Sequence, residues 1–393
     1  MSSAHPRSQE LFARAQKVLP GGNTRTTVFH APHPLYAASG EGCRLMDADG
    51  VERLDFLNNY TALIHGHRHP EIIAAVQEQL NLGTAFANPT ESEIALAELL
   101  CERVPSFDQV RFCNSGSEAV MVAVKAAQAH TNRPKIAKAE GCYHGSYTPV
   151  EVSLSPDPSN WGEDAPASVP YSRGTPQGIL DDVVVIPFNY VEATERILTP
   201  HADTLAALLI DPMPNRVGMI SATPEFLKFC RDFCDKHGIV LIFDEVITFR
   251  VNSAGVQGEQ KVKPDLTTLA KIIGGGFPVG ALAGSKEVMS VFDPRGGNPA
   301  LPHGGTYNAN PVTMVAGLAA MNLLDQAAFT KMNALGEKTR EALRQAFRLA
   351  EMPGQVTGEG SLFCLHLTDQ PLTDFRSARK DKTTAARMAQ LHH

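Results

Sequence analysis

The pattern of apolar and polar residues divides the middle of the chain into short apolar runs and longer amphipathic stretches. Residues 183–186, 205–210 and 239–243 are continuous apolar runs, and the last is rich in β-branched residues, which is typical of strands buried on both faces. Residues 70–83 and 223–237 have helical periodicity, with proline near the start and glycine just after the last turn. Alternation of this kind through about residue 290 predicts an α/β fold with a largely parallel, doubly wound central sheet.

The two ends of the chain have a different pattern. Residues 9–19 predict a short helix with Ser8 as its N-cap, and 43–56 predict two strands joined by an Asp-Gly turn. Near the other end, residues 327–350 predict a long helix and 358–367 a pair of strands. We expect both ends to pack together as a smaller α+β domain beside the central sheet.

This organisation gives expected domain boundaries. The N-terminal part of the small domain covers residues 1–66, the large domain covers 67–312, and the C-terminal part of the small domain covers 313–393. Residues 155–182, which contain Trp161, are rich in Pro, Ser, Gly and Asp and predict a long irregular loop. Long loops in compact domains are often functional covers.

Composition and charge exclude several classes of function. The net charge of -7 argues against a polyanion-binding surface, so we expect no nucleic-acid partner. No apolar run approaches the length of a membrane span, so we expect no membrane association. The seven cysteines have no metal-ligand spacing, which favours a reducing, cytoplasmic setting and no metal.

An acid at a strand end and a lysine downstream are the strongest candidates for chemistry. Asp244 directly follows the apolar run 239–243, at the end of a parallel strand where α/β sheets bind ligands. Lys271 lies between apolar residues and the glycine run 274–276, where burial would favour a neutral, nucleophilic amine. Such a pair suits a pyridoxal phosphate site. Taken alone, Asp244 could equally be a cap or ion-pair partner, and Lys271 could extend to solvent.

Two polar turns follow predicted strands. Ser115, Gly116 and Ser117 lie between a short strand and a long apolar helix, a layout that offers N–H groups to a phosphate. A plain helix cap is the alternative for this turn. Tyr143 and His144 lie between glycines after the next strand, where an aromatic ring can cover a flat cofactor.

Two further features allow either a ligand-binding or a plain structural interpretation. Arg25 lies in a glycine-led polar loop and is either solvated or a bidentate carboxylate ligand. The alternating His65, His67 and His69 could suggest metal, but no cysteine or acidic cluster accompanies them. A loop beside a ligand pocket is therefore the favoured interpretation of this histidine-rich stretch.

Five motifs occur in one order along nearly the whole chain: Asn114-Ser115-Gly116-Ser117-Glu118-Ala119, Gly141-Cys142-Tyr143-His144-Gly145, Phe243-Asp244-Glu245-Val246, Leu269-Ala270-Lys271-Ile272-Ile273-Gly274-Gly275-Gly276 and His303-Gly304-Gly305-Thr306-Tyr307. With these motifs the chain resembles the class III (ω-type) pyridoxal-phosphate aminotransferases of fold type I. It is most similar to the branch that holds glutamate-1-semialdehyde aminomutase and the β-amino-acid (β-phenylalanine) aminotransferases.

The resemblance implies a role for each matching residue. Lys271 would carry the Schiff base with pyridoxal 5'-phosphate and later move the substrate proton, and Asp244 would pair with the pyridine nitrogen. Tyr143 would stack on one face of the ring and Val246 would pack on the other. His144 is adjacent to the site but has no clear chemical role in this interpretation.

The resemblance also implies a shared site between two subunits. Ser115, Gly116 and Ser117 would bind the cofactor phosphate, and Thr306 would reach the phosphate of the neighbouring subunit. We therefore expect a homodimer that acts on a small-molecule amino donor and a keto-acid acceptor by a ping-pong mechanism. An intramolecular aminomutase is the alternative. Arg25 is the candidate ligand for the substrate carboxylates and Arg250 the weaker one.

The chain also departs from the family pattern. Asp211-Pro212 stands where relatives commonly have Glu-Pro, so we expect this shorter acid to lie further from the pocket. The sequence stops at residues 389–393, apparently within a helix, whereas the family continues for some tens of residues. We therefore expect the given sequence to be incomplete at its C-terminus.

Overall fold

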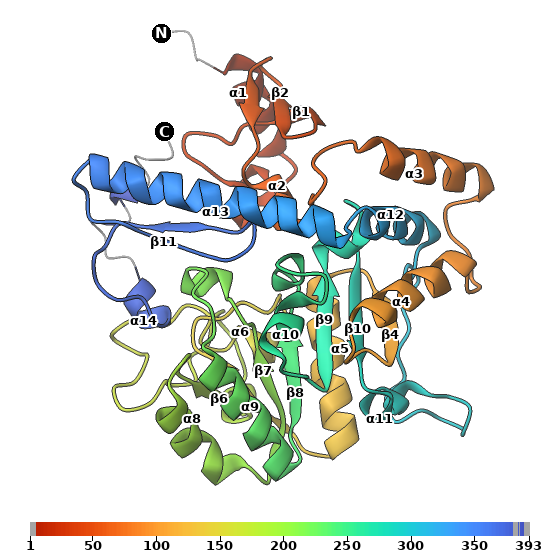
Figure 1. Ribbon diagram of the computed structural model, residues 1–393, viewed down its shortest axis with the longest axis vertical. Helices are drawn as coiled ribbons and strands as arrows, with labels where there is room; N and C mark the ends of the chain where they lie inside the picture. Colours follow the sequence, from red (N-terminus) through yellow and green to blue (C-terminus); the bar gives the residue numbers. More distant parts are fainter. Residues whose placement is uncertain (1–4, 380–383, 385, 389–393) are drawn as a thin grey trace.

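A seven-stranded sheet forms the centre of the computed structural model, which describes residues 5–379, 384 and 386–388 (Figure 1). The strand order is β4-β10-β9-β8-β7-β5-β6. All neighbours are parallel except β10, which runs antiparallel to both β4 and β9. The strands are β4 (Gln109–Cys113), β5 (Lys135–Ala139), β6 (Val183–Ile186), β7 (Leu205–Ile210), β8 (Val240–Asp244), β9 (Leu266–Ala270) and β10 (Gly280–Gly284). The predicted α/β fold is confirmed, and β9 adds a strand that the sequence pattern did not reveal.

Helices cover both faces of this sheet. On one face α5 (Gly116–Thr131) packs its buried valines and alanines against alternate residues of β5, β7 and β8. On the other face α9 (Pro224–His237) and α8 (Val191–Leu198) cover the remaining alternate residues. All residues of β7 and β8 are therefore buried. Burying one such aliphatic side chain contributes about 1.5–3 kcal/mol to folding.

Three more helices pack around the β4–β10 side of the sheet. They are α3 (Pro70–Leu82), α4 (Glu91–Arg103) and α12 (Pro311–Asn322). Gly83 ends α3 at a positive φ, as the sequence predicted. Within the described residues no single helix is long and apolar enough to cross a membrane, although α12 and the helix after it, bent by 77°, would pass as a pair on length and composition.

The N-terminal segment forms a small antiparallel sheet with a helix beside it. Strands β1 (Ala37–Glu41), β2 (Arg44–Asp47) and β3 (Glu52–Leu54) include the predicted hairpin. Helix α1 (Pro6–Ala15) begins at a proline, so Ser8 lies inside the helix and the predicted N-cap is wrong. The Ser8 hydroxyl instead donates to Asp49 Oδ2 at 2.5 Å, which ties α1 to the hairpin turn.

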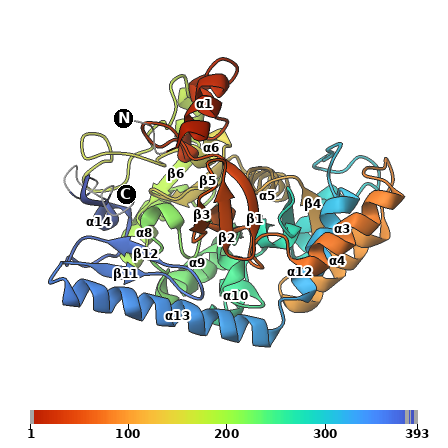
Figure 2. The same cartoon turned by 90° about the horizontal axis from the view of Figure 1, so that it is seen from above.

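The C-terminal segment is built on one long helix. Helix α13 (Gln326–Leu349) is followed by β11 (Gln355–Thr357) and β12 (Cys364–His366), which pair antiparallel. The predicted strand pair at 358–367 is therefore misplaced, because Gly358 and Gly360 have positive φ and turn the chain between the strands. Figure 2 shows α13 along one side of the molecule with β11 and β12 beside it.

The two ends of the chain meet, as expected. The rings of Phe56 and Phe363 form an edge-on contact with centroids 6.4 Å apart. The domain boundaries themselves stay a prediction. The expected helical stop at 389–393 lies outside the described residues.

Candidate active site

A cavity of about 370 Å³ opens at the carboxyl ends of the parallel strands. Strand β8 delivers Asp244 to it, and the turn after β9 delivers Lys271. The cavity wall contains the predicted site residues Ser115, Gly116, Ser117, Tyr143, Asp244, Val246 and Lys271, but not Arg25, Thr306 or the weaker candidate Arg250. Its size and its mixture of apolar and polar groups are those of a small-molecule site.

Asp244 is held in one orientation by three groups. Its Oδ1 accepts from the Val246 N–H at 3.1 Å and from Thr268 Oγ1 at 3.2 Å. Its Oδ2 lies 2.8 Å from His144 Nδ1. The register of β8 and β9 places Thr268 directly opposite Asp244. A carboxylate fixed in this way can present its charge to one ligand atom in the cavity.

His144 supports Asp244 from inside the protein. The side chain is buried, and burial lowers its pKa although the Asp244 carboxylate opposes this shift. A neutral imidazole with its proton on Nδ1 can donate to Asp244. Its Nε2 is buried and has no hydrogen-bond partner among the described residues. The sequence had placed His144 near the site without assigning this contact.

Lys271 has the environment of a nucleophilic amine. It begins η6 (Lys271–Gly274) with a φ of 52°, an unusual backbone conformation for a residue with a side chain. Burial lowers the pKa of its amine, and the carboxylates of Asp244 and Asp211 partly oppose this shift. A larger fraction of the lysine is therefore neutral than in water.

Asp211 lines the same cavity, so the expectation that it lies further away is wrong. Strand β7 is the direct neighbour of β8, which brings the residues after both strands to one edge. Burial raises the pKa of Asp211 well above its usual value, and the nearby charge of Asp244 raises it further. Both effects favour the neutral form of Asp211.

The turn 114–117 forms both a helix cap and an open set of donors. Ser115 Oγ accepts from the Glu118 N–H at 3.2 Å, so the capping alternative is realised in the structure. The cap uses one N–H, and the remaining N–H groups of the first turn of α5 face the cavity end of the helix. A Cβ at Gly116 would lie 3.1 Å from Val246 Cγ1, so glycine allows Val246 to close on this turn. The arrangement fits an anion at the positive helix end.

The loop that carries Tyr143 is braced by the C-terminal segment. Phe375, in α14 (Phe375–Ala378), lies against Gly141, where a Cβ would meet its ring at 2.0 Å. The guanidinium of Arg376 forms a bidentate ion pair with Glu140, with distances of 2.7 and 3.0 Å. These contacts join residues more than 200 positions apart, and no local pattern in the sequence indicated them.

Arg25 and Thr306 lie outside the cavity wall of this chain. Thr306 is exposed, in a loop that Arg111 anchors through bonds to His303 Nδ1 at 2.7 Å and His303 O at 2.8 Å. Arg25 is also exposed, and its Nη1 donates to Asn59 Oδ1 at 3.3 Å. Asn59 does line the cavity, and it belongs to the histidine-rich stretch 58–69, for which the sequence favours a loop beside a ligand pocket.

The histidines of the stretch 65–69 make contacts other than metal coordination. His65 Nε2 lies 2.8 Å from the carbonyl of Ala320, and His67 Nε2 lies 2.8 Å from Asp55 Oδ2. Across the described part of the chain, no cluster of three or more histidine, cysteine or acidic side chains could hold a metal ion. The donor set of the cavity is instead that of an organic cofactor with a phosphate, a ring nitrogen and a carbonyl.

Comparison with known proteins agrees with this chemistry. Residues 27–389 match the family described as aminotransferase class-III. An ω-transaminase structure from Sphaerobacter thermophilus is 58% identical with a TM-score of 0.97, over 98% of this chain and 88% of that one. A β-phenylalanine aminotransferase structure from Variovorax paradoxus is 35% identical with a TM-score of 0.87, over 99% and 86%. Glutamate-1-semialdehyde 2,1-aminomutase of Methanothermobacter thermautotrophicus is 41% identical, over 96% of this chain and 87% of that protein. The chain belongs to the class-III aminotransferase family, the pyridoxal-phosphate-dependent transaminases of fold type I.

Proposed function

We propose that this protein transfers an amino group from an amino acid, with β-amino acids as leading candidates, or from an amine to a keto acid. The observation that carries the proposal is the placement of Lys271 and Asp244 in one cavity, the first with a lowered amine pKa and the second held by His144. Similarity to an ω-transaminase and to a β-phenylalanine aminotransferase supports the choice of donor class.

Each cavity residue has a role in this proposal. Bound pyridoxal phosphate would supply a carbonyl and an electron-accepting ring. Lys271 would hold that carbonyl covalently and, once released, move a proton between the substrate carbon and the cofactor C4′. Asp244 would keep a proton on the ring nitrogen. The N–H groups and hydroxyls of Ser115, Gly116 and Ser117 would bind the phosphate, and Tyr143 and Val246 would cover the two faces of the ring.

A ping-pong reaction requires one pocket to accept two carboxylate substrates in turn. Arg25 is our candidate for the shared ligand because its guanidinium contacts Asn59, which lines the cavity, and lies over the Tyr60 ring at 5.7 Å. A planar guanidinium can bind either carboxylate through two parallel hydrogen bonds.

An intramolecular aminomutase is the second candidate. The identity of 41% with an archaeal glutamate-1-semialdehyde 2,1-aminomutase supports it, together with the segment 142–145. An aminomutase returns the amino group to the same carbon skeleton, so it needs no external acceptor. Dependence on an added keto acid therefore separates the two activities.

We also propose a homodimer with shared sites. Thr306 is exposed on an anchored loop outside the cavity of its own chain, as a residue serving the neighbouring subunit would be. The side chains of Leu80, Leu82 and Phe86 are exposed apolar groups at the end of α3, and a partner subunit could cover them. Light scattering that gives the mass of one chain would contradict this arrangement. The cytoplasmic setting stays a prediction.

The test of the proposed function is a donor and acceptor screen on protein loaded with pyridoxal phosphate. The donors are α-amino acids, β-amino acids, simple amines and glutamate 1-semialdehyde, each with pyruvate, 2-oxoglutarate or no acceptor. We expect turnover of amino acids only when a keto acid is present. Turnover of the semialdehyde alone, with no other donor accepted, would favour the aminomutase and overturn the proposal.

The same screen tests Arg25. Arg25→Ala should raise KM for carboxylate donors at least about tenfold and leave KM for simple amines nearly unchanged, because only the former lose an ion pair. Arg44→Ala is the matched control, since Arg44 is an exposed arginine that pairs with Glu52 away from the cavity. Equal changes in KM for both kinds of donor would remove the role of Arg25.

A further inference from the structure

The turn 58–61 has an unusual backbone conformation. Asn58, Asn59, Tyr60 and Thr61 have successive φ values of 41°, 50°, 53° and 72°, all in the left-handed region. Asparagine tolerates this region, but an aromatic residue and above all a β-branched residue are strained there. The hydroxyl of Thr61 is also buried without a hydrogen-bond partner among the described residues. A turn with these costs persists only when its surroundings hold it in place.

Arg250 is the side chain that holds this turn. Its Nη1 donates to the Thr61 carbonyl at 3.0 Å and to Asn58 Oδ1 at 3.4 Å, and its Nε donates to Ser361 Oγ at 3.1 Å. Arg250 is only 5% exposed, and each of these acceptors is a neutral oxygen. Burial lowers its pKa to about 10, and no carboxylate in the described part of the chain opposes the shift. A buried guanidinium without an acidic partner is costly, which indicates that its position matters.

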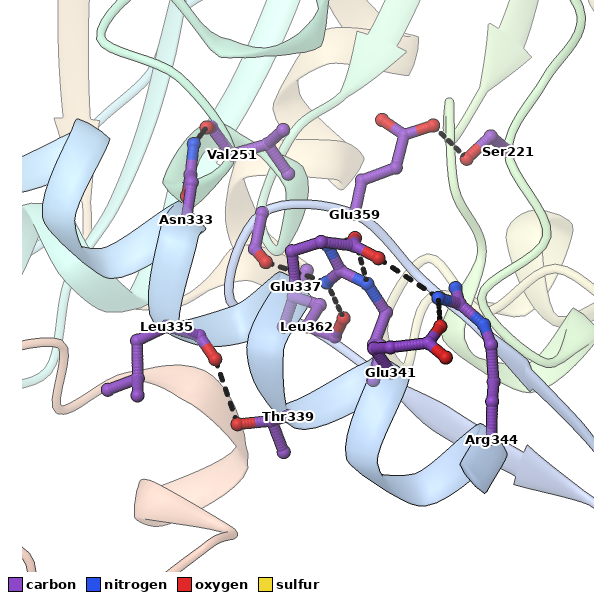
Figure 3. A network of polar contacts seen from close by, with 12 residues as sticks. Ser221, Val251, Asn333, Leu335, Glu337, Thr339, Glu341, Arg344, Glu359 and Leu362 are labelled. Carbon is purple, nitrogen blue, oxygen red and sulfur yellow. Dashed lines mark hydrogen bonds and ion pairs between the residues drawn. The ribbon is translucent and has the colours of Figure 1, made fainter. Parts of the chain in front are cut away.

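The C-terminal segment fixes Arg250 from the opposite side. Arg340, in α13, donates through Nη1 to the carbonyls of Gly360 and Leu362 at 2.7 and 2.9 Å, which holds the loop that carries Ser361. Asn333, two turns earlier on the same face of α13, donates to the carbonyl of Val251 at 2.8 Å (Figure 3). Helix α13 therefore holds both Val251, the sequence neighbour of Arg250, and the loop of Ser361, which contacts the Arg250 side chain.

The turn itself forms part of the cavity wall. Asn59 and Ala62 line the cavity. Asn59 Oδ1 accepts from Arg25, and the Tyr60 hydroxyl donates to Thr27 Oγ1 at 2.9 Å. Displacement of the turn would therefore move both the wall and the loop that carries Arg25, while Lys271 and Asp244 stay on the sheet.

We propose that Arg250 is a positioning residue that holds the strained turn 58–61 in the cavity wall, so that Asn59 and Arg25 meet the carboxylate of the substrate. This inference rests on the proposed function for its substrate, but the contact between Arg250 and the turn does not depend on it. The side chain of Arg250 bonds to the turn and to Ser361 and does not line the cavity, so we expect it to affect the substrate through the turn.

Hydrogen exchange tests the structural half of the proposal. The amides of Thr61, Ala62 and Leu63 donate to the carbonyls of Leu57, Asn59 and Asn58, so their exchange reports whether the turn is formed. In cofactor-loaded protein, Arg250→Met should speed their exchange at least about tenfold, and Arg250→Lys should have a smaller effect because one amine cannot reach all three acceptors. If Arg250→Met does not fold, the exchange of the same amides in Arg250→Lys tests the proposal. Unchanged exchange in the folded variants would overturn the proposal.

Steady-state kinetics test the functional half. Arg250→Lys should raise KM for a carboxylate donor about tenfold, with kcat, the visible absorbance of bound cofactor and KM for a simple amine unchanged. The control is Arg344→Met, which removes a half-exposed arginine from the network of Figure 3 without touching the turn. Equal rises in KM for both donors, or a loss of cofactor absorbance, would overturn the role in carboxylate recognition. If wild-type protein transfers no amino group at all, the proposed function fails, and hydrogen exchange still decides the role of Arg250.

Discussion

Three ionisable side chains in the cavity have different environments, and this difference sets their charges. Asp244 accepts hydrogen bonds from the Val246 N–H and from Thr268, and its Oδ2 lies 2.8 Å from His144 Nδ1, whose imidazole has a pKa lowered by burial. Asp211, directly after the neighbouring strand β7, has a raised pKa, which favours its neutral form. Lys271 has a lowered amine pKa. Burial therefore disfavours the charged forms of Asp211 and Lys271, which makes the amine of Lys271 more available as a nucleophile.

A fourth ionisable side chain, a buried lysine outside the cavity wall, gives a prediction for pH dependence. Lys138 is fully buried in β5 and donates to the carbonyls of Ala139 and Val152 at 3.1 and 2.9 Å. Burial lowers its pKa from 10.5 to about 8. The unfolded chain then binds more protons between pH 8 and 10.5, so the stability contributed by this group rises with pH across that window.

Lys138→Met should therefore be stabilised relative to wild type, and the gain in the free energy of unfolding should be largest below pH 8. The lowered pKa of Lys138 corresponds to a gain in stability of at most about 3 kcal/mol in the variant. The loss of the two hydrogen bonds of Lys138 reduces this gain. Thermal unfolding of both proteins at pH 7 and pH 9.5 measures this, and we expect the difference in Tm between variant and wild type to fall as pH rises. Lys135→Met, at a half-exposed lysine of the same strand, is the control. A difference in Tm that does not change with pH would contradict the prediction.

At the scale of elements, the position of Lys271 depends on how closely α12 approaches η6. Gly275 has a φ of 59°, and a Cβ there would lie 2.3 Å from the Ala316 carbonyl oxygen. A Cβ at Gly317 would lie 2.2 Å from the carbonyl oxygen of Ile273. The two backbones are in direct contact, so neither residue can gain a side chain without a shift of the turn that begins at Lys271.

We predict that Gly317→Ala destabilises the protein by about 1–3 kcal/mol, the usual cost of overpacking, and weakens cofactor binding by displacing Lys271. Differential scanning calorimetry and cofactor titration measure the two effects. Gly178→Ala is the control, in α7 (Gln177–Asp181), because nothing lies within 4 Å of a Cβ there. An unchanged Tm and cofactor affinity in Gly317→Ala would show that the contact does not position the lysine.

At the scale of the whole molecule, distant parts of the chain build one cavity. The sheet supplies its base with Asp244 and Lys271, the N-terminal segment supplies Asn59, and α14 braces the loop of Tyr143. The parts of the site at strand ends could be predicted from the sequence, because an apolar run followed by an acid fixes both the strand and its polar end. The positions of Asn59 and Arg250 could not, because a left-handed turn and a buried arginine depend on contacts made only after folding.

The same reasoning explains the errors in the fold. Strand β9, Leu266–Ala270, is short and contains two threonines, so its apolar pattern is weak, and pairing with β8 decides its conformation. Strand β10 is antiparallel because the turn after Lys271 returns the chain directly to β9 instead of crossing over through a helix. Asp211 lies at the cavity because β7 ends beside β8. An aspartate in place of the longer glutamate does not change this position.

The central claim is that Lys271 is the residue that binds pyridoxal phosphate covalently. Reduction of the loaded protein with borohydride, followed by mass spectrometry of its peptides, tests this directly because reduction makes the bond permanent. We predict that the cofactor mass is found on Lys271, that Lys138 is unmodified, and that Lys271→Ala retains no label. Label on another lysine, or no label on protein that carries the cofactor, would contradict the account.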